Sequence, residues 1–330
     1  MQDKESQAQK NVESESIIWT EKYRPQDFSE VRGQEVITKR IKAMVEQNNV
    51  PNLLFAGPPG VGKTSLALII AKTLFGKGWR ENTLEMNASD ERGIDTIRST
   101  IKDFARTKPI GNAPFKFCIL DEADALTKEA QHALRRTMEL FTRTCRLCLI
   151  ANYSSKLIEP IQSRCAVFRF KPLPKEAVEE IILGIAGKEG LVITSEKIMN
   201  ILFDVSEGDV RKMENILQSC AVLSKNINED MIYEIVSSAR PKEIRKLLEL
   251  ATAGDFVGAR ELLLEVMLKH GLSGLDIIKQ IQKEVWNLNI EDKKKVELID
   301  KCGEIEFRMV EGSDEFLQLE ALLANFLNIV

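Results

Sequence analysis

The chain has 330 residues, of which 44% are hydrophobic and 29% are charged. This length suggests about two domains with a third possible, and the apolar content excludes a wholly disordered chain. No run of eighteen apolar residues is present, so we predict neither a membrane span nor a membrane partner. Six cysteines in a chain of this length do not form a disulfide framework and favour a reducing compartment.

Charge is unevenly distributed along the chain, although the formal net charge is only −4. Residues 17–172 carry 25 Lys and Arg against 17 Asp and Glu, an excess of 8 positive charges. Residues 173–330 carry 19 against 29, an excess of 10 negative charges. A basic front half favours a polyanionic partner, and ordinary surface variation is the alternative explanation. The polar segment 1–16 lacks the apolar core of a secretory signal and predicts a disordered tail.

Short apolar runs alternate with helical patterns over residues 17–171. Strands are predicted at 53–56, 83–87, 115–120, 145–151 and 166–170. Helices are predicted at 36–47, 63–75, 94–106 and 128–141. Because strands that alternate with helices form βαβ units, the sequence predicts an α/β domain with a mostly parallel sheet that is covered on both faces.

The pattern changes at residues 171–174 (KPLP), where the prolines cannot continue a helix and indicate a linker. All later segments have helical periodicity, with a second break near Pro241. The helical stretches beyond that break are 242–252, 256–269, 273–288, 293–302 and 314–329. We therefore predict two all-α regions after the α/β domain, at 172–237 and 238–330.

Residues 57–64 read GPPGVGKT and fit the phosphate-binding loop G-x-x-x-x-G-K-[ST], between a predicted strand and a predicted helix. In such a loop, backbone N–H groups and the positive end of the helix surround a phosphate. Lys63 would reach the β- and γ-phosphates, and the Thr64 hydroxyl would reach Mg²⁺. A glycine-rich turn without a ligand is the alternative. The predicted nucleotide contacts are Gly57, Pro58, Pro59, Gly60, Val61, Gly62, Lys63, Thr64 and Ser65.

A buried strand is predicted to end at Asp121 and Glu122 in the run FCILDEAD. This order after a phosphate-binding loop predicts that Asp121 holds Mg²⁺ and that Glu122 polarises the attacking water. A plain acidic pair on the surface is the alternative. No guanine-reading N-K-x-D motif occurs, so the sequence favours ATP as the nucleotide.

Four segments carry a more specific pattern: WTEKYRP at 19–25, NASDERG at 87–93, DEAD at 121–124 and IEPIQSRC at 158–165. They resemble the boxes of the replication factor C small subunit, an AAA+ clamp loader of archaea and eukaryotes. Segment 124–141 looks most similar to the archaeal versions. The resemblance implies an AAA+ P-loop ATPase domain at 17–171, a helical lid at 172–237 and a helical collar that joins subunits at 238–330.

The resemblance also implies roles for residues outside the loop. Asn152 matches a sensor of the γ-phosphate, although an Asn that ends a strand can equally cap a turn. Arg211 matches a second sensor of the family. A cation in the first turn of a helix opposes the helix dipole, so a ligand phosphate explains its place better than helix stability does. Pairing of Arg211 with Asp209 or Glu214 is the alternative. The residues that match the adenine pocket are Tyr23, Arg24, Pro25, Val31, Gly33 and Gln34.

Arg164 of the Ser-Arg-Cys segment matches an arginine that reaches out of its own subunit into the nucleotide site of a neighbour. The planar guanidinium group can brace phosphate oxygens, so the resemblance implies that hydrolysis is completed in trans. The alternative is a buried arginine that pairs with Glu159. The implied catalytic residues are Lys63, Asp121, Glu122, Asn152 and the neighbour's copy of Arg164.

A row of cations is predicted along the helix 94–106, where Arg98, Lys102 and Arg106 are spaced by four residues. On the next predicted helix the cations are Lys128, Arg135 and Arg136. Such rows, repeated around a ring, would contact the phosphates of a DNA duplex. The basic front half and the resemblance favour DNA binding, and a solvated helix face is the alternative.

We predict an ATP-driven clamp-loader subunit that helps to open a sliding clamp and to place it on primer–template DNA. The predicted partners are the clamp, the large subunit, other small subunits and the DNA, in a pentameric hetero-oligomeric ring. Loop 107–114 lies where the family touches its clamp. The alternatives are another AAA+ DNA-processing ATPase, for branch migration or replication restart, and a scaffold subunit that does not hydrolyse ATP. An archaeal chain would act in the cytoplasm and a eukaryotic one in the nucleus.

Two further signals are not assigned to a functional site. Cys145 and Cys148 form a C-x-x-C within a predicted buried strand, and no second cysteine pair is available to complete a zinc site. His132 and His270 are isolated in the sequence, so neither is a candidate ligand or base.

Overall fold

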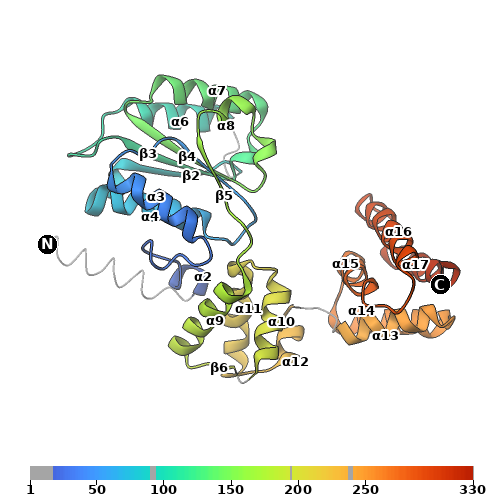
Figure 1. Cartoon of the computed structure of the whole chain (residues 1–330). Coiled ribbons are helices and arrows are strands. Elements are labelled where there is room, and N and C mark those ends of the chain that lie inside the picture. Colours follow the sequence, from blue (N-terminus) through green and yellow to red (C-terminus); the bar gives the residue numbers. More distant parts are fainter. Residues whose placement is uncertain (1–17, 90–93, 194, 237–240, 330) are drawn as a thin grey trace. The chain divides into compact units, whose positions relative to one another are not determined.

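The structure is a computed structural model that describes residues 18–89, 94–193, 195–236 and 241–329 (Figure 1). The chain divides into two compact units, the first ending at Asn226 and the second beginning at Ile227. The predicted tail at 1–16 lies outside the described residues, as do residues 90–93 of the NASDERG segment and the residues directly before Pro241.

Five parallel strands form the sheet of the first unit, in the order β2-β3-β4-β1-β5. The strands are β1 (Leu53–Ala56), β2 (Thr83–Asn87), β3 (Lys116–Asp121), β4 (Cys145–Ala151) and β5 (Ala166–Arg169). All five predicted strands and the predicted parallel sheet are confirmed. The register pairs Ala56 with Ala151, so the loops that leave β1 and β4 start side by side. Because the strands are parallel, this carboxyl edge of the sheet gathers the residues that follow β1, β3 and β4.

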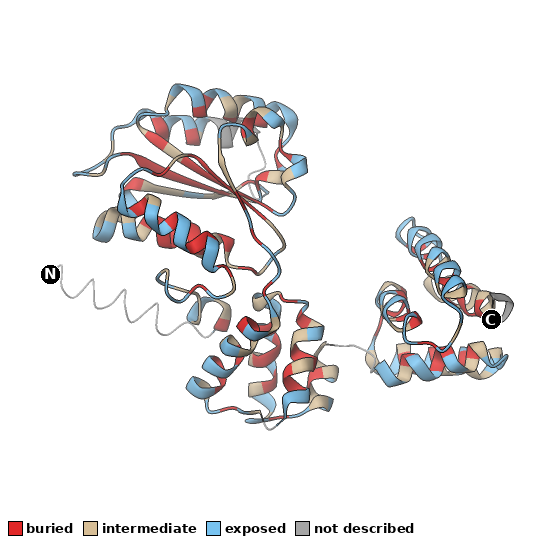
Figure 2. Ribbon diagram, in the orientation of Figure 1, coloured by how far each residue is buried: buried red, intermediate tan, exposed pale blue. Residues whose placement is uncertain are grey.

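Helices cover both faces of the sheet. Figure 1 shows α3 (Glu35–Glu46) and α4 (Lys63–Phe75) on one face and α6 (Ile94–Arg106) and α7 (Lys128–Leu140) on the other. Every position of α4 from Leu66 to Ala71 is buried, as its continuous apolar sequence predicts. The shorter elements are α2 (Trp19–Lys22), η1 (Gly76–Gly78), α5 (Trp79–Asn82), η2 (Ala123–Ala125), η3 (Ser154–Lys156) and α8 (Glu159–Gln162). The buried residues in Figure 2 accordingly follow the strands and the helix sides that face them.

Three helices complete the first unit, and the third of them is anchored on the phosphate-binding loop. The elements are α9 (Lys175–Glu189), β6 (Val192–Ile193), α10 (Glu196–Ser206), α11 (Val210–Leu223) and β7 (Asn226–Ile227). The Asp209 carboxylate caps α11 by accepting the Lys212 N–H at 3.1 Å, and the Val210 N–H donates to the Gly60 carbonyl at 3.2 Å. The start of α11 therefore has a defined position over the loop at 57–64.

The second unit consists of six helices among its described residues: α12 (Glu229–Val236), α13 (Pro241–Thr252), α14 (Phe256–His270), α15 (Gly274–Val285), α16 (Asp292–Val310) and α17 (Glu315–Ile329). The predicted helices are present, but α16 continues to Val310, beyond the predicted end at 302. Leu298, Cys302, Ile305 and Met309 repeat at helical spacing and are buried, so the apolar face outweighs the low helix propensity of Gly303. In the described part of the chain, no helix is both long enough and apolar enough to cross a membrane.

Candidate nucleotide-binding site

Lys63 is the central cation of the loop that leaves β1. The residue is 7% exposed, and its Nζ donates to the carbonyls of Gly57 at 2.7 Å and Pro58 at 2.6 Å. The same ammonium donates to Oδ1 of Asn152 at 3.1 Å, from the segment that follows β4. Burial lowers the pKa of Lys63 to about 8, because desolvation penalises the charged form. This ammonium has lost most of its water and is placed to bind an anion at the carboxyl edge of the sheet.

Two oxygen donors meet beside Lys63. The Thr64 hydroxyl, in the first turn of α4, donates to Oδ2 of Asp121 at 2.6 Å, and Asp121 ends β3. The other Asp121 oxygen accepts the Glu122 N–H at 2.8 Å, which holds the carboxylate in place. Hydroxyl and carboxylate oxygens are the ligands that Mg²⁺ prefers, and it uses one or two of them while it keeps several waters. The residues present therefore fit a magnesium ion.

Glu122 is exposed and lies next to this oxygen pair. It has a φ of 51°, in the left-handed region that is unfavourable for residues other than glycine. The turn between β3 and η2 holds it there, so its carboxylate lines the same cavity as Lys63 and Thr64. A carboxylate so placed can accept a proton from a water molecule beside a bound phosphate.

The site residues surround one cavity of about 240 Å³ in the first unit. Most of the predicted residues line it: Tyr23, Arg24, Pro25, Val31, Pro59, Gly60, Val61, Gly62, Lys63, Thr64, Ser65, Asp121, Glu122, Asn152 and Arg211. Arg211 is the second residue of α11 and makes no ion pair with Asp209 or Glu214 in the described part of the chain. Gly57 and Pro58 contribute through the carbonyls that hold Lys63.

Gly33 and Gln34 lie outside the lining of this cavity. Gly33 has a φ of 72°, and a Cβ there would come within 3.1 Å of the Leu173 side chain. The Gln34 amide donates to the Lys171 carbonyl at 2.8 Å. The two residues thus fasten the start of α3 to the linker at 171–174, and the turn at Gly33 directs the chain away from the cavity.

The N-terminal wall of the cavity is fastened to α9 and α11. The Trp19 N–H donates to Oε1 of Gln218 at 3.0 Å, and the Tyr23 hydroxyl donates to the carboxylate of Glu189. Lys22 also contacts Glu189, with 2.5 Å between Nζ and Oε1. These contacts hold the segment that carries Tyr23, Arg24 and Pro25 against the helices that follow the linker.

Sequence reasoning assigned no nucleotide contact to several further lining residues: Thr20, Glu30, Arg32, Leu173, Ile181, Val210 and Glu214. Glu214 is distinctive, because it is a carboxylic acid of which only 6% is exposed. Burial raises the pKa of Glu214 to about 7. Its spacing from Val210 and Leu217 puts it on the buried face of α11, and a charged residue at such a position was the signal available in the sequence.

Two family profiles match the chain: "ATPase family associated with various cellular activities (AAA)" at residues 53–173 and "Replication factor C C-terminal domain" at residues 239–325. The replication factor C small subunit of Archaeoglobus fulgidus is 53% identical over 93% of this chain and 96% of that protein. Its counterpart in Methanococcus vannielii is 56% identical over 93% and 97%, and the one in Thermofilum pendens is 51% identical over 93% and 95%.

The chain belongs to the replication factor C small-subunit family. The clamp-loader function in DNA replication, the AAA ATPase activity and the binding of nucleotide that the motifs predicted are thereby confirmed. The solved structure of the Thermotoga maritima RuvB Holliday junction branch migration motor is similar, with a TM-score of 0.54 over 69% of this chain and 78% of that one. At 21% identity, this likeness shows a common fold alone.

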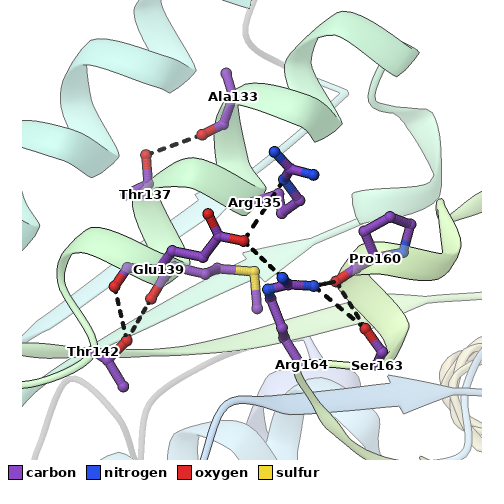
Figure 3. Close-up of polar contacts among 9 residues, drawn as sticks. Ala133, Arg135, Thr137, Glu139, Thr142, Pro160, Ser163 and Arg164 are labelled. Atoms are coloured by element: carbon purple, nitrogen blue, oxygen red, sulfur yellow. Dashed lines mark hydrogen bonds and ion pairs between the residues drawn. The ribbon is translucent and has the colours of Figure 1, made fainter.

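Arg164 lies outside the lining of the cavity in its own chain. Figure 3 shows it reaching toward α7, where Nη2 is 2.7 Å from Oε1 of Glu139. Nη1 donates to the Pro160 carbonyl at 2.7 Å. The guanidinium is exposed rather than buried, and its ion-pair partner is Glu139 instead of the Glu159 considered from the sequence. Glu139 also faces Arg135, with 3.8 Å between Oε1 and Nε.

The predicted DNA-binding cations are not equally available. Lys102 and Arg106 on α6 and Arg136 on α7 are exposed. Arg135 is only partly exposed, and its Nε is buried without a hydrogen-bond partner beside Glu139. Arg98 belongs to α6, but its side chain lies outside the described residues.

The burial of the C-x-x-C cysteines agrees with the packing role expected of them. Cys145 and Cys148 are buried free thiols of β4, and burial raises the pKa of Cys145 to about 12. His132 is exposed on α7. His270 ends α14 with its Nε2 at 2.9 Å from the Glu243 carboxylate, so it belongs to a contact between α13 and α14.

Proposed function

We propose that this chain binds ATP with Mg²⁺ in the cavity above the phosphate-binding loop, and that a neighbouring subunit completes the site for hydrolysis. One observation supports this most directly: the Lys63–Asn152 contact and the Thr64–Asp121 contact lie side by side in one cavity. A cation, a pair of magnesium ligands and a free carboxylate are the groups that phosphoryl transfer to water needs.

Each group has a distinct task in this proposal. Lys63 exchanges its loop carbonyls for the β- and γ-phosphate oxygens, and Arg211 approaches the same phosphates from α11. Thr64 and Asp121 hold Mg²⁺, which neutralises phosphate charge when it is bound. Glu122 orients the attacking water and accepts its proton, while the Asn152 amide hydrogen-bonds the γ-phosphate. Tyr23, Arg24, Pro25 and Val31 surround the base.

The exposed Arg164 is suited to serve a neighbour's cavity. Its ion pair with Glu139 joins side chains that are 39% and 41% exposed. An ion pair of such exposure stabilises the chain by only about 0–1 kcal/mol. Little free energy is therefore lost when Arg164 leaves Glu139 to contact a phosphate in the neighbouring site. An arginine supplied in trans raises the rate of phosphoryl transfer by about 10³–10⁵-fold in other systems.

The proposed partners follow from the family and from the charge of the surface. We propose a pentameric ring with the large subunit and other small subunits, in which Lys102, Arg106 and Arg136 contact the phosphates of primer–template DNA. ATP binding then lets the ring open and hold a sliding clamp, and hydrolysis releases the clamp on the DNA. Because the relatives named above come from archaea, we place this work in an archaeal cytoplasm.

The decisive experiment measures ATP binding and turnover in the isolated chain and in the assembled complex with clamp and primed DNA. A Glu122→Gln change should preserve the ATP dissociation constant and lower turnover by about 10²–10⁴-fold. Arg164→Ala should leave ATP binding by the isolated chain unchanged and abolish most turnover by the complex. Arg169→Ala, at another exposed arginine of the same domain, is the matched control and should retain turnover.

Two results would contradict this function. Normal turnover by the Glu122→Gln complex would remove Glu122 from its assigned task. An isolated chain that is verified as monomeric and hydrolyses ATP as fast as the complex would refute completion by a neighbour. Unwinding or branch migration of DNA without a clamp would instead support a motor of the RuvB kind.

A further inference from the structure

Glu214 is a buried acid in the nucleotide cavity for which the proposed hydrolysis has no use. It lies on α11, one turn after Arg211, and lines the cavity while only 6% of the residue is exposed. Within the described part of the chain, its carboxyl group has no hydrogen-bond donor and no ion-pair partner. A buried carboxylate without a donor is costly, and a donor that arrives with the ligand would remove this cost.

The position of Glu214 along α11 tells which part of a nucleotide it would meet. At the start of the helix, the Val210 N–H bonds the Gly60 carbonyl of the phosphate-binding loop. Further along, Gln218 accepts the N–H of Trp19, at the base of the segment that carries Tyr23. Glu214 lies midway, about 6 Å along the axis from either end at 1.5 Å per residue. In the proposed binding of ATP, the phosphates lie at the first end and the base at the second, and the ribose joins them.

No charged neighbour neutralises Glu214. Arg211 and Arg24 favour its ionised form, whereas Asp209 and Glu21 oppose it. Arg24 is engaged with Glu21, with 2.6 Å between Nη2 and Oε1, and Asp209 caps α11. Burial outweighs these charges and raises the pKa of Glu214 to about 7, so the nucleotide-free site holds a mixture of both forms at neutral pH.

We propose that Glu214 accepts a hydrogen bond from a ribose hydroxyl of the bound nucleotide and is a specificity-determining residue for ribonucleotides. The inference rests on the proposed binding of ATP in this cavity. A carboxylate is the group that dinucleotide-binding folds use for the same ribose hydroxyls. Because the hydroxyl donates best to the ionised acid, nucleotide binding favours ionised Glu214, and the contribution of Glu214 to ATP affinity should rise with pH through neutrality.

The test measures dissociation constants of the full chain with Mg²⁺ and three ligands: ATP, 2′-deoxy-ATP and 3′-deoxy-ATP. The wild type should bind one deoxy analogue about tenfold more weakly than ATP at pH 8. Glu214→Leu should bind all three within about twofold of one another, whereas Glu214→Gln should show an intermediate preference. Lowering the pH from 8 to 6 should weaken ATP binding more in the wild type than in either variant.

The matched control is Glu30→Gln, which changes another carboxylate of the same cavity. Glu30 is exposed and already accepts the Gln26 N–H at 2.6 Å, so its loss should leave the ribose preference intact. Equal preference for ATP over the deoxy analogues in the wild type and in Glu214→Leu would overturn the ribose contact. A Glu214→Leu effect that is seen with ATP but lost with purine riboside triphosphate, which lacks the amino group of adenine, would overturn it in favour of the base. A wild-type chain that binds no ATP would refute the proposed function as well.

Discussion

Replacing Glu214 by an uncharged residue should raise the free energy of unfolding of the nucleotide-free chain. The size of this increase should depend on pH. The pKa of Glu214 rises from 4.5 to about 7 on folding, because the cavity desolvates the carboxylate. At about 1.4 kcal/mol per pKa unit, burial of the ionised acid costs roughly 3 kcal/mol. The folded state binds this proton more tightly than the unfolded state, so the stabilising contribution is complete below pH 4.5 and is lost as the pH rises through 7.

Glu214→Gln removes the titration while it keeps the size of the side chain. Between pH 5 and pH 8, the free energy of unfolding of this variant relative to the wild type should therefore increase by roughly 2–3 kcal/mol. In a unit of this size, such a change corresponds to a difference of roughly 5–10 °C in melting temperature. Urea denaturation and thermal melting of the first unit, both without nucleotide, measure it at each pH.

The control is Glu30→Gln, at an exposed carboxylate of the same cavity. A Glu214→Gln difference from the wild type that stays constant from pH 5 to pH 8 would refute the reasoning. Such a result would mean that water solvates the Glu214 carboxylate in the nucleotide-free chain. The carboxylate would then not require a hydrogen-bond donor from the ribose.

Three other changes test the site and its surroundings. Gly60→Ala would put a Cβ at 1.7 Å from the Asp209 carboxylate that caps α11, so ATP affinity should fall by about tenfold or more in a calorimetric titration. Thr64→Ala should remove the difference in ATP affinity between solutions with Mg²⁺ and with EDTA, and a preserved difference would exclude Thr64 as a metal ligand. Changing Lys102 and Arg106 together to Ala should weaken DNA binding by the complex and lower the salt dependence by about one unit per lost phosphate contact. Lys212→Ala on α11 should not do so, and equal losses in both variants would contradict a specific contact by α6.

Local sequence was sufficient for the elements that depend on local periodicity and turn chemistry. The strands before Gly57 and Asp121 are short apolar runs, and both are found where they were predicted because a parallel sheet requires apolar residues on both faces. The residues that follow these strands meet at one edge because the strands run parallel, so the grouping of Lys63, Thr64 and Asp121 was also predictable.

Local patterns were less informative where packing decides between alternatives. The length of α16 depends on Ile305 and Met309, whose burial is not evident from neighbouring residues. The partner of Arg164 is Glu139, which is distant in sequence and comes close only because α7 packs beside α8. Gly33 was grouped with the adenine pocket on family resemblance, but its positive φ turns the chain toward the linker.

By itself, therefore, the sequence determined the parallel α/β fold, the phosphate-binding loop and the acidic pair at the end of a strand. It also determined the family to which the chain belongs. Tertiary structure decided which residues of α11 line the cavity, because contacts with distant segments, Val210 with Gly60 and Gln218 with Trp19, set the position of the helix. These contacts bring Glu214 to the cavity, about 150 residues after the phosphate-binding loop. The spacing of Glu214 along α11 indicates a buried face, but contacts between distant segments decide that this face lies at the nucleotide cavity.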